Sequence, residues 1–294
     1  MGTVAQQEEV EALEKGRAFA DLSSYRKVRV SGSDARSWLN DLVTADVATL
    51  EPGGPARRSL LLTPTGRIRA DFSIAEDDGF LLLQAPDQPE HVGLLLSPYV
   101  LTSEVSLHDD TNGLALFAVP GDAASVVGQP GRAPSVLGSG VDVVTPAGKA
   151  AWRVLDMFVK HGLVEAGAAA LDIWRIRQGI ARMGVDFGSD ALPAEVGLEW
   201  TIDLTKGCFL GQESVARVRN LGHPPRSLVH VHADEEVRVG APVSSEGATV
   251  GEITSAAPSI DNAWVAIARI RWDVAESPLN TGDGTGLGRV RRTD

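Results

Sequence analysis

Three apolar segments follow one another between residues 57 and 85, and short turn-forming stretches separate them. The segments read RRSLLLT, RIRADFSIA and FLLLQA, and the separating stretches contain PTG and EDDG. Proline, glycine and aspartate favour tight turns, so segments joined in this way pair as neighbouring antiparallel strands. The pattern therefore predicts a three-stranded meander.

Extended and helical patterns also occur on either side of the meander. The stretch RKVRVS at residues 26–31 alternates polar and apolar side chains, which predicts a half-buried strand. It is followed by SDARSWLNDLVTADV, whose apolar residues fall on one face of a helix. A strand followed by a helix is the start of an α/β unit. We also predict a helix from residue 87, strands over 103–109 and 113–120, and a short helix over 121–128.

The second half of the chain shows fewer clear patterns. Residues 129–149 are rich in glycine, proline and serine and are interpreted as a loop, and AWRVLDMFV at 151–159 is predicted to be a strand. The segment EAGAAALDIWRIRQGI at 165–180 has apolar residues at helical spacing. Near the C-terminus, GDGTGLG at 282–288 lacks the spacing of a dinucleotide-binding loop and is interpreted as a mobile tail.

Two adjacent prolines in GHPPR mark a domain boundary, and short apolar segments at close intervals follow it. That pattern is typical of a small β-barrel or sandwich. We therefore predict an α+β core over residues 1–222 and a β-barrel domain over 223–294. The core is expected to contain two similar α+β units, at approximately 20–110 and 111–222.

Charge and cysteine content exclude several classes of function. The chain has 27 Lys and Arg against 39 Asp and Glu, a formal net charge of -12, so it repels nucleic acid and anionic membrane as a whole. We expect no direct nucleic-acid partner and no membrane partner. No apolar run approaches the roughly 18 to 20 residues that cross a bilayer, and the N-terminus does not read as a signal peptide. One cysteine rules out an internal disulfide, so a cytoplasmic location is expected.

The single thiol, Cys208, lies in the motif KGCFLGQE at residues 206–213. Buried structural cysteines have apolar neighbours, whereas this one lies between a lysine, two glycines and a Gln-Glu pair. Lys206 and a helix beginning near Gly211 both favour the thiolate form. Such a thiolate can act as a nucleophile, a redox centre or a shared metal ligand, and a structural role remains the alternative.

A second candidate lies in RIRQGIARMGVDF, residues 175–187, where Asp186 follows the long helix. Its carboxylate can accept paired N–H donors from a heterocycle, or it can be a solvated group in a helix-terminating turn. His230 and His232 lie at i and i+2 of a predicted strand and share a face, but no third metal ligand is apparent. We expect no metal site.

Together these motifs resemble the YgfZ family, folate-binding proteins related to the T-protein, the aminomethyltransferase of the glycine cleavage system. KGCFLGQE is similar to the family signature without departure, and LLTPTGRIRADF resembles the family's Gly-Arg hairpin. VSGSDARSWLNDLVTADVATL is similar to the family's first strand and helix, and MGVD to a segment that ends in Tyr-Gly-x-Glu in T-proteins.

The resemblance implies a fold and a set of ligand contacts. The expected fold is a pseudo-symmetric pair of ferredoxin-like α+β units with a C-terminal β-barrel, arranged as a ring around tetrahydrofolate. Asp186 would contact the pterin, and Gln212 or Glu213 would poise Cys208. Arg217 and Arg226, together with Arg175, are the basic residues considered for the folate tail.

The resemblance also implies a function. YgfZ-like proteins support the maturation or repair of iron–sulfur enzymes, including ones that modify tRNA, and their cysteine is the functional hallmark. The expected partners are folate and iron–sulfur client or assembly proteins, with Cys208 and Lys206 as functional residues. The alternatives are a folate-dependent one-carbon transferase with Asp71 as the acid, or a non-catalytic folate-sensing scaffold. Ala70 stands where T-proteins have a further aspartate, which weakens the transferase alternative.

Overall fold

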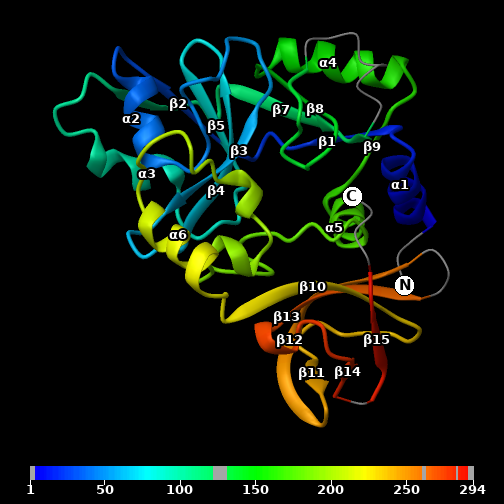
Figure 1. Cartoon of the computed structure of the whole chain (residues 1–294). Helices are drawn as coiled ribbons and strands as arrows, with labels where there is room; N and C mark the ends of the chain where they lie inside the picture. Colours follow the sequence, from blue (N-terminus) through cyan, green and yellow to red (C-terminus); the bar gives the residue numbers. More distant parts are fainter. Residues whose placement is uncertain (1–3, 122–130, 260–262, 283, 291–294) are drawn as a thin grey trace. The chain divides into compact units, whose positions relative to one another are not determined.

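The computed structural model describes residues 4–121, 131–259, 263–282 and 284–290 (Figure 1). The chain forms two compact units. The first unit contains Met1–Thr63, Arg69–Leu171 and Thr201–Gln212, and the second contains Pro64–Ile68, Asp172–Trp200 and Glu213–Asp294.

Two sheets and most of the helices lie in the first unit. Its elements are α1 (Val4–Glu14), β1 (Ala18–Asp21), β2 (Arg26–Ser31), α2 (Ala35–Leu42), β3 (Arg57–Leu62), β4 (Ile68–Glu76), β5 (Phe80–Gln84), α3 (Val92–Leu96), the 3-10 helix Ser97–Tyr99, β6 (Ser106–Asp109), β7 (Leu114–Val119), β8 (Val141–Pro146), α4 (Lys149–Lys160) and β9 (Val164–Glu165). Helix α5 (Ala168–Arg177) begins in the first unit and ends in the second.

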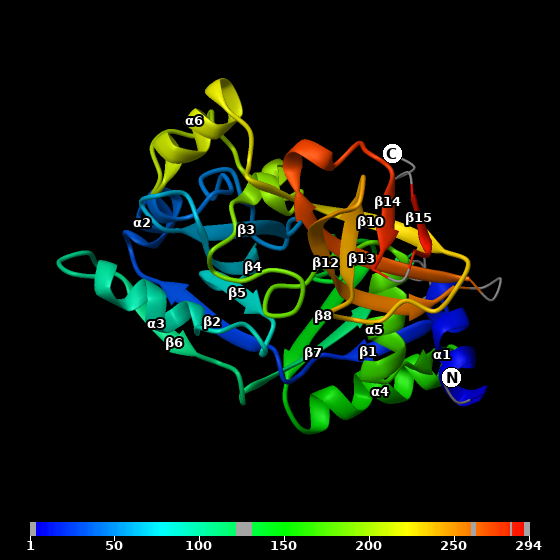
Figure 2. The same cartoon turned by 90° about the horizontal axis from the view of Figure 1, so that it is seen from below.

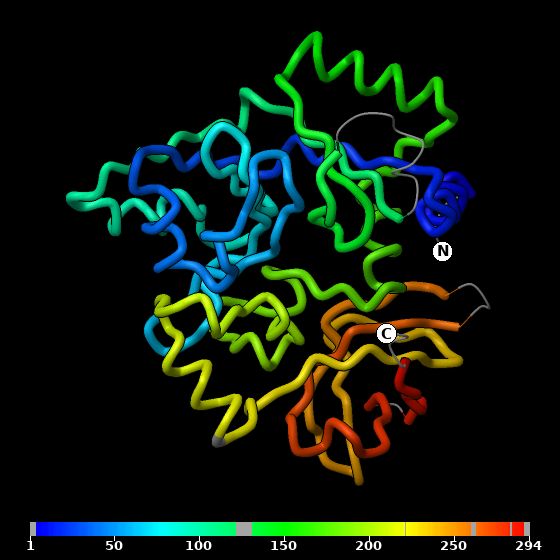
Figure 3. The backbone as a smooth tube through the Cα atoms, turned by 45° about the horizontal axis from the view of Figure 1, so that its top comes forward, coloured from blue at the N-terminus to red at the C-terminus, as the bar shows by residue number. Residues whose placement is uncertain are grey.

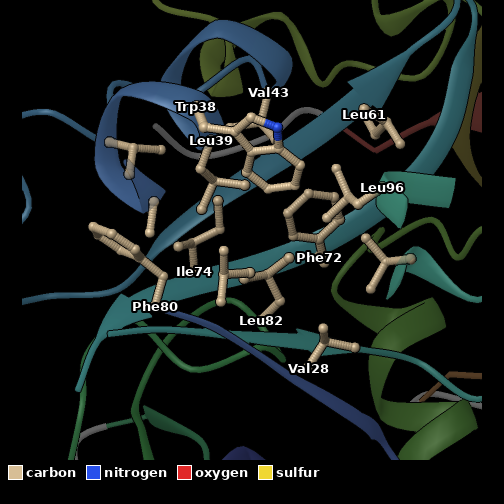
Figure 4. Packing of buried hydrophobic residues seen from close by; sticks show 14 of the residues in the cluster. Val28, Trp38, Leu39, Val43, Leu61, Phe72, Ile74, Phe80, Leu82 and Leu96 are labelled. Atoms are coloured by element: carbon tan, nitrogen blue, oxygen red, sulfur yellow. The ribbon is translucent and has the colours of Figure 1, made fainter. Parts of the chain in front are cut away.

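The five-stranded sheet has the order β3-β4-β5-β2-β6, so the predicted meander is confirmed. Both faces of β5 are buried, and this explains why its sequence is a continuous apolar run rather than an alternating one. Phe80 and Leu82 pack with Trp38 and Leu39 of α2 (Figure 4). Leu81 and Leu83 belong to a different apolar cluster. The alternation follows from the two-residue period of a strand.

That second cluster also receives side chains from the four-stranded sheet, whose order is β8-β7-β1-β9. Leu116 and Ala118 of β7 pack there, whereas Phe117 points to the opposite face of its sheet. On that opposite face, Phe117 meets Phe19 of β1 and Phe158 of α4, and the ring centres of Phe19 and Phe158 are 4.9 Å apart. Figure 2 shows helix α4 lying alongside strands β7 and β1. The first unit is therefore layered, with its two sheets sharing one apolar layer and helices packed on their outer faces.

Three predictions in this region differ from the structure. Residues 149–160 form helix α4 rather than a strand, and β8 lies within the predicted loop. Val154 and Phe158 are one helical turn apart and both are buried, so the helical spacing decides the structure over the strand preference of individual residues. Helix α3 begins at Val92 rather than at residue 87. The short helix predicted over 121–128 falls almost entirely outside the described residues.

The second unit contains a closed barrel with the strand order β10-β13-β12-β11-β14-β15, seen as the yellow to red trace in Figure 3. Its strands are β10 (Arg226–Ala233), β11 (Pro242–Ser245), β12 (Ala248–Pro258), β13 (Trp264–Arg271), β14 (Leu279–Thr281) and β15 (Gly286–Arg289). Helix α6 (Gln212–Leu221) precedes it, and short 3-10 helices lie at Pro193–Glu195, Glu199–Thr201 and Trp272–Val274. The barrel is filled by an apolar cluster that includes Val231, Val243 and Ile270.

The interpretation of residues 282–288 as a mobile tail was wrong, because β15 closes the barrel between β10 and β14. Glycine is needed there for space. A Cβ atom at Gly288 would lie 2.1 Å from a ring carbon of His232 on β10. Gly288 therefore allows β15 to pack closely against β10.

The predicted fold class is confirmed, since α+β sheets are combined with a C-terminal β-barrel. The predicted domain boundary at residue 222 and the two similar units in the core stay predictions. No helix in the described part of the chain is both long enough and apolar enough to cross a membrane.

Candidate functional site

Cys208 lies in a loop of the first unit that is anchored on the C-terminal end of α2. The Asp203 amide donates to the Thr44 carbonyl at 3.0 Å, and the Leu210 amide donates to the Asp41 carbonyl at 3.1 Å. Phe209 is buried, while Cys208 beside it is an exposed free thiol. The alternative of a buried structural cysteine is therefore wrong, and the loop holds the thiol toward solvent.

Two glycines shape this loop. Gly207 and Gly211 have φ values of 110° and 84°, in the left-handed region that side chains with a Cβ rarely adopt. No atom lies within 4 Å of the position that a Cβ would take at Gly207, so the requirement there is conformational rather than spatial. The glycines flank Cys208 and Phe209 and allow the chain to turn in and out of the surface within a few residues.

Lys206 fastens the loop to α2. Its ammonium group donates to the Asn40 carbonyl and lies 5.2 Å from the centre of the Phe209 ring. Burial lowers the pKa of Lys206 to about 8, although the nearby carboxylates of Asp46 and Asp41 act in the opposite direction. The ammonium group thus contacts α2 and Phe209, and the predicted effect of Lys206 on the thiol stays a prediction.

Gln212 closes the same turn. Its side-chain oxygen accepts a hydrogen bond from the Phe209 amide at 3.3 Å, and its own amide donates to the Phe209 carbonyl at 3.2 Å. Glu213, the next residue, lies in the first turn of α6 and is exposed. Gln212 thus supports the backbone next to Cys208.

Asp71, on β4 of the same unit, is paired with Arg58 of β3. The arginine donates from Nε to Oδ1 at 2.8 Å and from Nη2 to Oδ2 at 2.5 Å. Burial by itself lowers the pKa of Arg58, but the charge and hydrogen bonds of Asp71 outweigh it and raise that pKa above its usual value. Ala70 next to Asp71 is fully buried. Both carboxylate oxygens of Asp71 are therefore engaged within the protein.

Asp186 lies in the second unit and is fully buried, so the alternative of a solvated turn residue is wrong. Its Oδ2 atom accepts from Arg175 Nη1 at 2.8 Å and from the Arg182 amide at 2.9 Å. Its Oδ1 atom accepts from the hydroxyls of Thr254 at 2.7 Å and Ser255 at 2.6 Å. The predicted contact with a pterin stays a prediction, and it would require some of these four hydrogen bonds to be exchanged.

The arginines considered for an anionic tail differ in availability. Arg175 is buried and bound to Asp186 and Asp172. Arg226, at the start of β10, is half exposed and lies 3.3 Å from Asp190. Arg217 lies on α6 and is exposed. Of the three, Arg217 and Arg226 have guanidinium groups within reach of solvent.

The structure thus brings Lys206, Cys208 and Gln212 together in one loop. Sequence reasoning missed Arg58, Thr254 and Ser255. Arg58 had a signal, because it and Asp71 lie at equal distances along the chain from the turn at residues 64 and 65. The two hydroxyl residues had none. Among the described residues, no group of three or more His, Cys, Asp and Glu side chains could hold a metal ion.

Comparisons with known proteins agree on one fold. Residues 3–130 match the family model described as the GCVT N-terminal domain. A putative chloroplastic transferase of Arabidopsis thaliana is 26% identical over 278 residues, which cover 84% of this chain and 63% of the relative. An aminomethyltransferase of Nostoc sp. is 27% identical over 285 residues, covering 84% of this chain and 74% of the relative. The chain thus spans less than two thirds of the Arabidopsis protein.

A solved structure resembles nearly the whole chain. The crystal structure of the glycine cleavage system aminomethyltransferase T from Bartonella henselae matches with a TM-score of 0.82 and 21% identity, covering 96% of this chain and 88% of that one. The closed six-stranded barrel and the mixed α+β sheets agree with that likeness. The chain therefore has the T-protein fold.

Proposed function

We propose that this protein is a tetrahydrofolate-binding accessory protein that supports the assembly or repair of iron–sulfur enzymes, including ones that modify tRNA, through Cys208. The observation that carries the proposal is the exposed position of this single thiol in an anchored loop. The T-protein fold and the resemblance of KGCFLGQE to the YgfZ signature give it further support.

The chemistry of the thiol suits a transient role. Iron–sulfur clusters are held by several thiolates, and this chain has one. Cys208 would therefore supply one ligand to a cluster whose other ligands come from a client or assembly protein. Alternatively, its thiolate would attack a disulfide of that protein, forming a mixed disulfide and releasing the other sulfur as a thiolate. Exposure is required for either step, because the cluster or the disulfide of the second protein must reach the thiol.

The folate part of the proposal rests on the relatives and the fold rather than on Asp186. When bound, a reduced folate carries one-carbon units on its pterin ring. Asp186 is buried and accepts four hydrogen bonds within the protein, so holding that ring would require some of these bonds to be exchanged. The exposed guanidinium groups of Arg217 and Arg226 suit an anionic tail.

A one-carbon transferase is the second candidate, and the names of the relatives favour it. Such a reaction uses a carboxylate that can exchange protons with the substrate. Asp71 is the acid that the sequence offers, and its two oxygens are bound by Arg58. Formation of methylenetetrahydrofolate from lipoyl-bound aminomethyl or N-methyl donors would establish this activity for the purified protein.

Two measurements test the proposal in separate steps. Calorimetric titration with tetrahydrofolate tests binding, and we expect saturable binding that Cys208→Ser leaves within about twofold of the unaltered affinity. Activity of iron–sulfur enzymes in a strain that lacks this protein tests the thiol, and we expect Cys208→Ser not to restore it. Thr205→Ser, an exposed hydroxyl residue of the same loop, is the matched control and should restore it fully.

Each outcome separates the candidates. Full restoration by Cys208→Ser would remove the thiol from the mechanism. If Asp71→Asn also restores the strain fully, a non-catalytic folate-sensing scaffold becomes the better description. Absence of tetrahydrofolate binding would refute the folate part while leaving the role of the thiol to be judged from the strain.

A further inference from the structure

Strand β12 contains a bulge where it faces Asp186. Ile253 pairs with Ala268 of β13, and Ser255 pairs with the preceding residue of β13, Ile267, so Thr254 is the extra residue. A bulge interrupts the alternation of side chains along a strand and re-aims the residues at its position. Here the hydroxyls of both Thr254 and Ser255 donate to the same atom, Oδ1 of Asp186.

Arg175 completes a closed ring of hydrogen bonds with these groups. It donates from Nη1 to Oδ2 of Asp186 at 2.8 Å and from Nη2 to the Ser255 hydroxyl at 2.9 Å. The remaining donors reach Asp172 from Nε at 2.6 Å and the Ile180 carbonyl from Nη1 at 3.1 Å. The guanidinium group is thus held on three sides, and its side chain is only 8% exposed.

Four donors surround the Asp186 carboxylate, which offers about four lone-pair positions when it is ionised. The single proton of the Thr254 hydroxyl is shared between this carboxylate at 2.7 Å and the Ile267 carbonyl at 3.0 Å. The Asp186 side chain is 0% exposed. A ligand that used Asp186 would first have to open a buried ion pair whose partners would then be left without compensation, which is strongly unfavourable.

We infer that Asp186 is a structural lock that fastens the turn over residues 182–187 and the end of α5 to the bulge in β12, and that it does not contact a ligand. The turn is shaped for this contact. The Asp186 amide donates to the Arg182 carbonyl at 2.9 Å, and Gly184 takes a φ of 90° between them. The amide of Arg182 in turn donates to the Asp186 carboxylate.

Hydroxyl-deleting variants test the lock without removing the charge pair. Ser255→Ala and Thr254→Val each remove one donor to Oδ1. We expect both to lower the urea midpoint of unfolding and to speed hydrogen exchange of the Arg182 amide at least tenfold, because that amide bonds to the same carboxylate. Thr249→Val is the matched control, an exposed threonine of the same strand, and should change neither quantity.

The Kd for tetrahydrofolate, measured by titration, distinguishes a structural residue from a ligand contact, because a purely structural role would leave it unchanged. This measurement rests on the proposed function. For Ser255→Ala and Thr254→Val we expect the Kd to stay within twofold of the unaltered protein. Asp186→Asn should unfold at lower urea than either, and if it does not fold at all the two hydroxyl variants decide the matter.

Two results would overturn the inference. One is an unaltered urea midpoint and unaltered Arg182 exchange in both hydroxyl variants. The other is an Asp186→Asn protein that keeps the original midpoint but binds tetrahydrofolate at least tenfold more weakly, which would make Asp186 a ligand contact. If the unaltered protein binds no tetrahydrofolate, the folate proposal fails, and the lock is still judged from unfolding and hydrogen exchange.

Discussion

The pairing of Asp71 with Arg58 leads to a prediction that separates a structural carboxylate from a catalytic one. Asp71→Asn keeps the shape of the side chain and removes its charge. The backbone of residue 71 stays anchored, because the substitution does not alter its two hydrogen bonds with Gln88. The backbone amide donates to Gln88 Oε1 at 3.0 Å, and Gln88 Nε2 donates to the backbone carbonyl. The substitution therefore isolates the loss of the ion pair.

The magnitude follows from the burial of the two partners. Opposite charges about 4 Å apart attract by about 4 kcal/mol at an effective dielectric constant of about 20. The Arg58 side chain is 27% exposed and Asp71 is 9% exposed, so water recovers part of that attraction when the pair is broken. We expect Asp71→Asn to lower the free energy of unfolding by about 2–3 kcal/mol, somewhat below the 3–5 kcal/mol typical of a fully buried pair.

Urea unfolding provides the assay, and the same strand offers a matched control. Arg69 of β4 binds Glu90 through two hydrogen bonds of 2.7 and 2.8 Å, but these side chains are 35% and 44% exposed. We expect Glu90→Gln to cost less than about 1 kcal/mol, with the same m-value as Asp71→Asn. A loss in Asp71→Asn no larger than that in Glu90→Gln would refute the argument from burial. Unchanged stability combined with loss of a one-carbon transfer activity would indicate a catalytic acid.

Three further predictions concern single groups. The Lys27 ammonium is buried and donates to the Ser23 and Tyr25 carbonyls, and burial lowers the pKa of Lys27 from 10.5 to about 8. Between these two pH values the unfolded chain binds more protons than the folded protein, so the free energy of unfolding should rise by about 1–3 kcal/mol from pH 8 to 10.5. Urea unfolding at a series of pH values measures this rise, and Lys27→Met should reduce it. Burial raises the pKa of Asp142 from 3.8 to about 7, so between these values the folded protein holds a proton that the unfolded chain releases. Stability should therefore fall as the pH rises from 3.8 to about 7. Urea unfolding over that range should show a smaller loss for Asp142→Asn than for the unaltered protein. Cys208 should react with one equivalent of a thiol reagent in the folded protein, and a reaction seen only in urea would contradict its exposed position.

Local pattern predicted much of the fold. The meander follows from signals within one stretch of chain. These are the turn residues between 57 and 85 and the apolar run of β5, which is buried on both faces. The same kind of reasoning failed for residues 149–160, where tryptophan, valine and phenylalanine suit a strand as well as a helix. The pattern does not distinguish the two, because residues four apart, such as Val154 and Phe158, share one face of a helix and also one face of a strand.

The candidate site also contains one residue that its sequence neighbours distinguish and one whose environment depends on distant residues. The flanks of Cys208 distinguish it from a buried structural cysteine within eight residues of sequence, because a lysine, two glycines and a Gln-Glu pair stand where such a cysteine has apolar neighbours. The environment of Asp186 depends on residues that are far away in the chain. Its hydroxyl partners follow it by 68 and 69 residues and reach it through a bulge that no local pattern announces.

The amino-acid sequence by itself determined the turns and most of the strands, because backbone preferences and the polarity of neighbours act over a few residues. The exposed position of the thiol also depends on the contacts that anchor its loop to α2. The tertiary structure alone decided which carboxylates are free. Whether Asp71 and Asp186 meet water, a ligand or an arginine depends on hydrogen-bond partners and burial, and these exist only once distant segments have packed together.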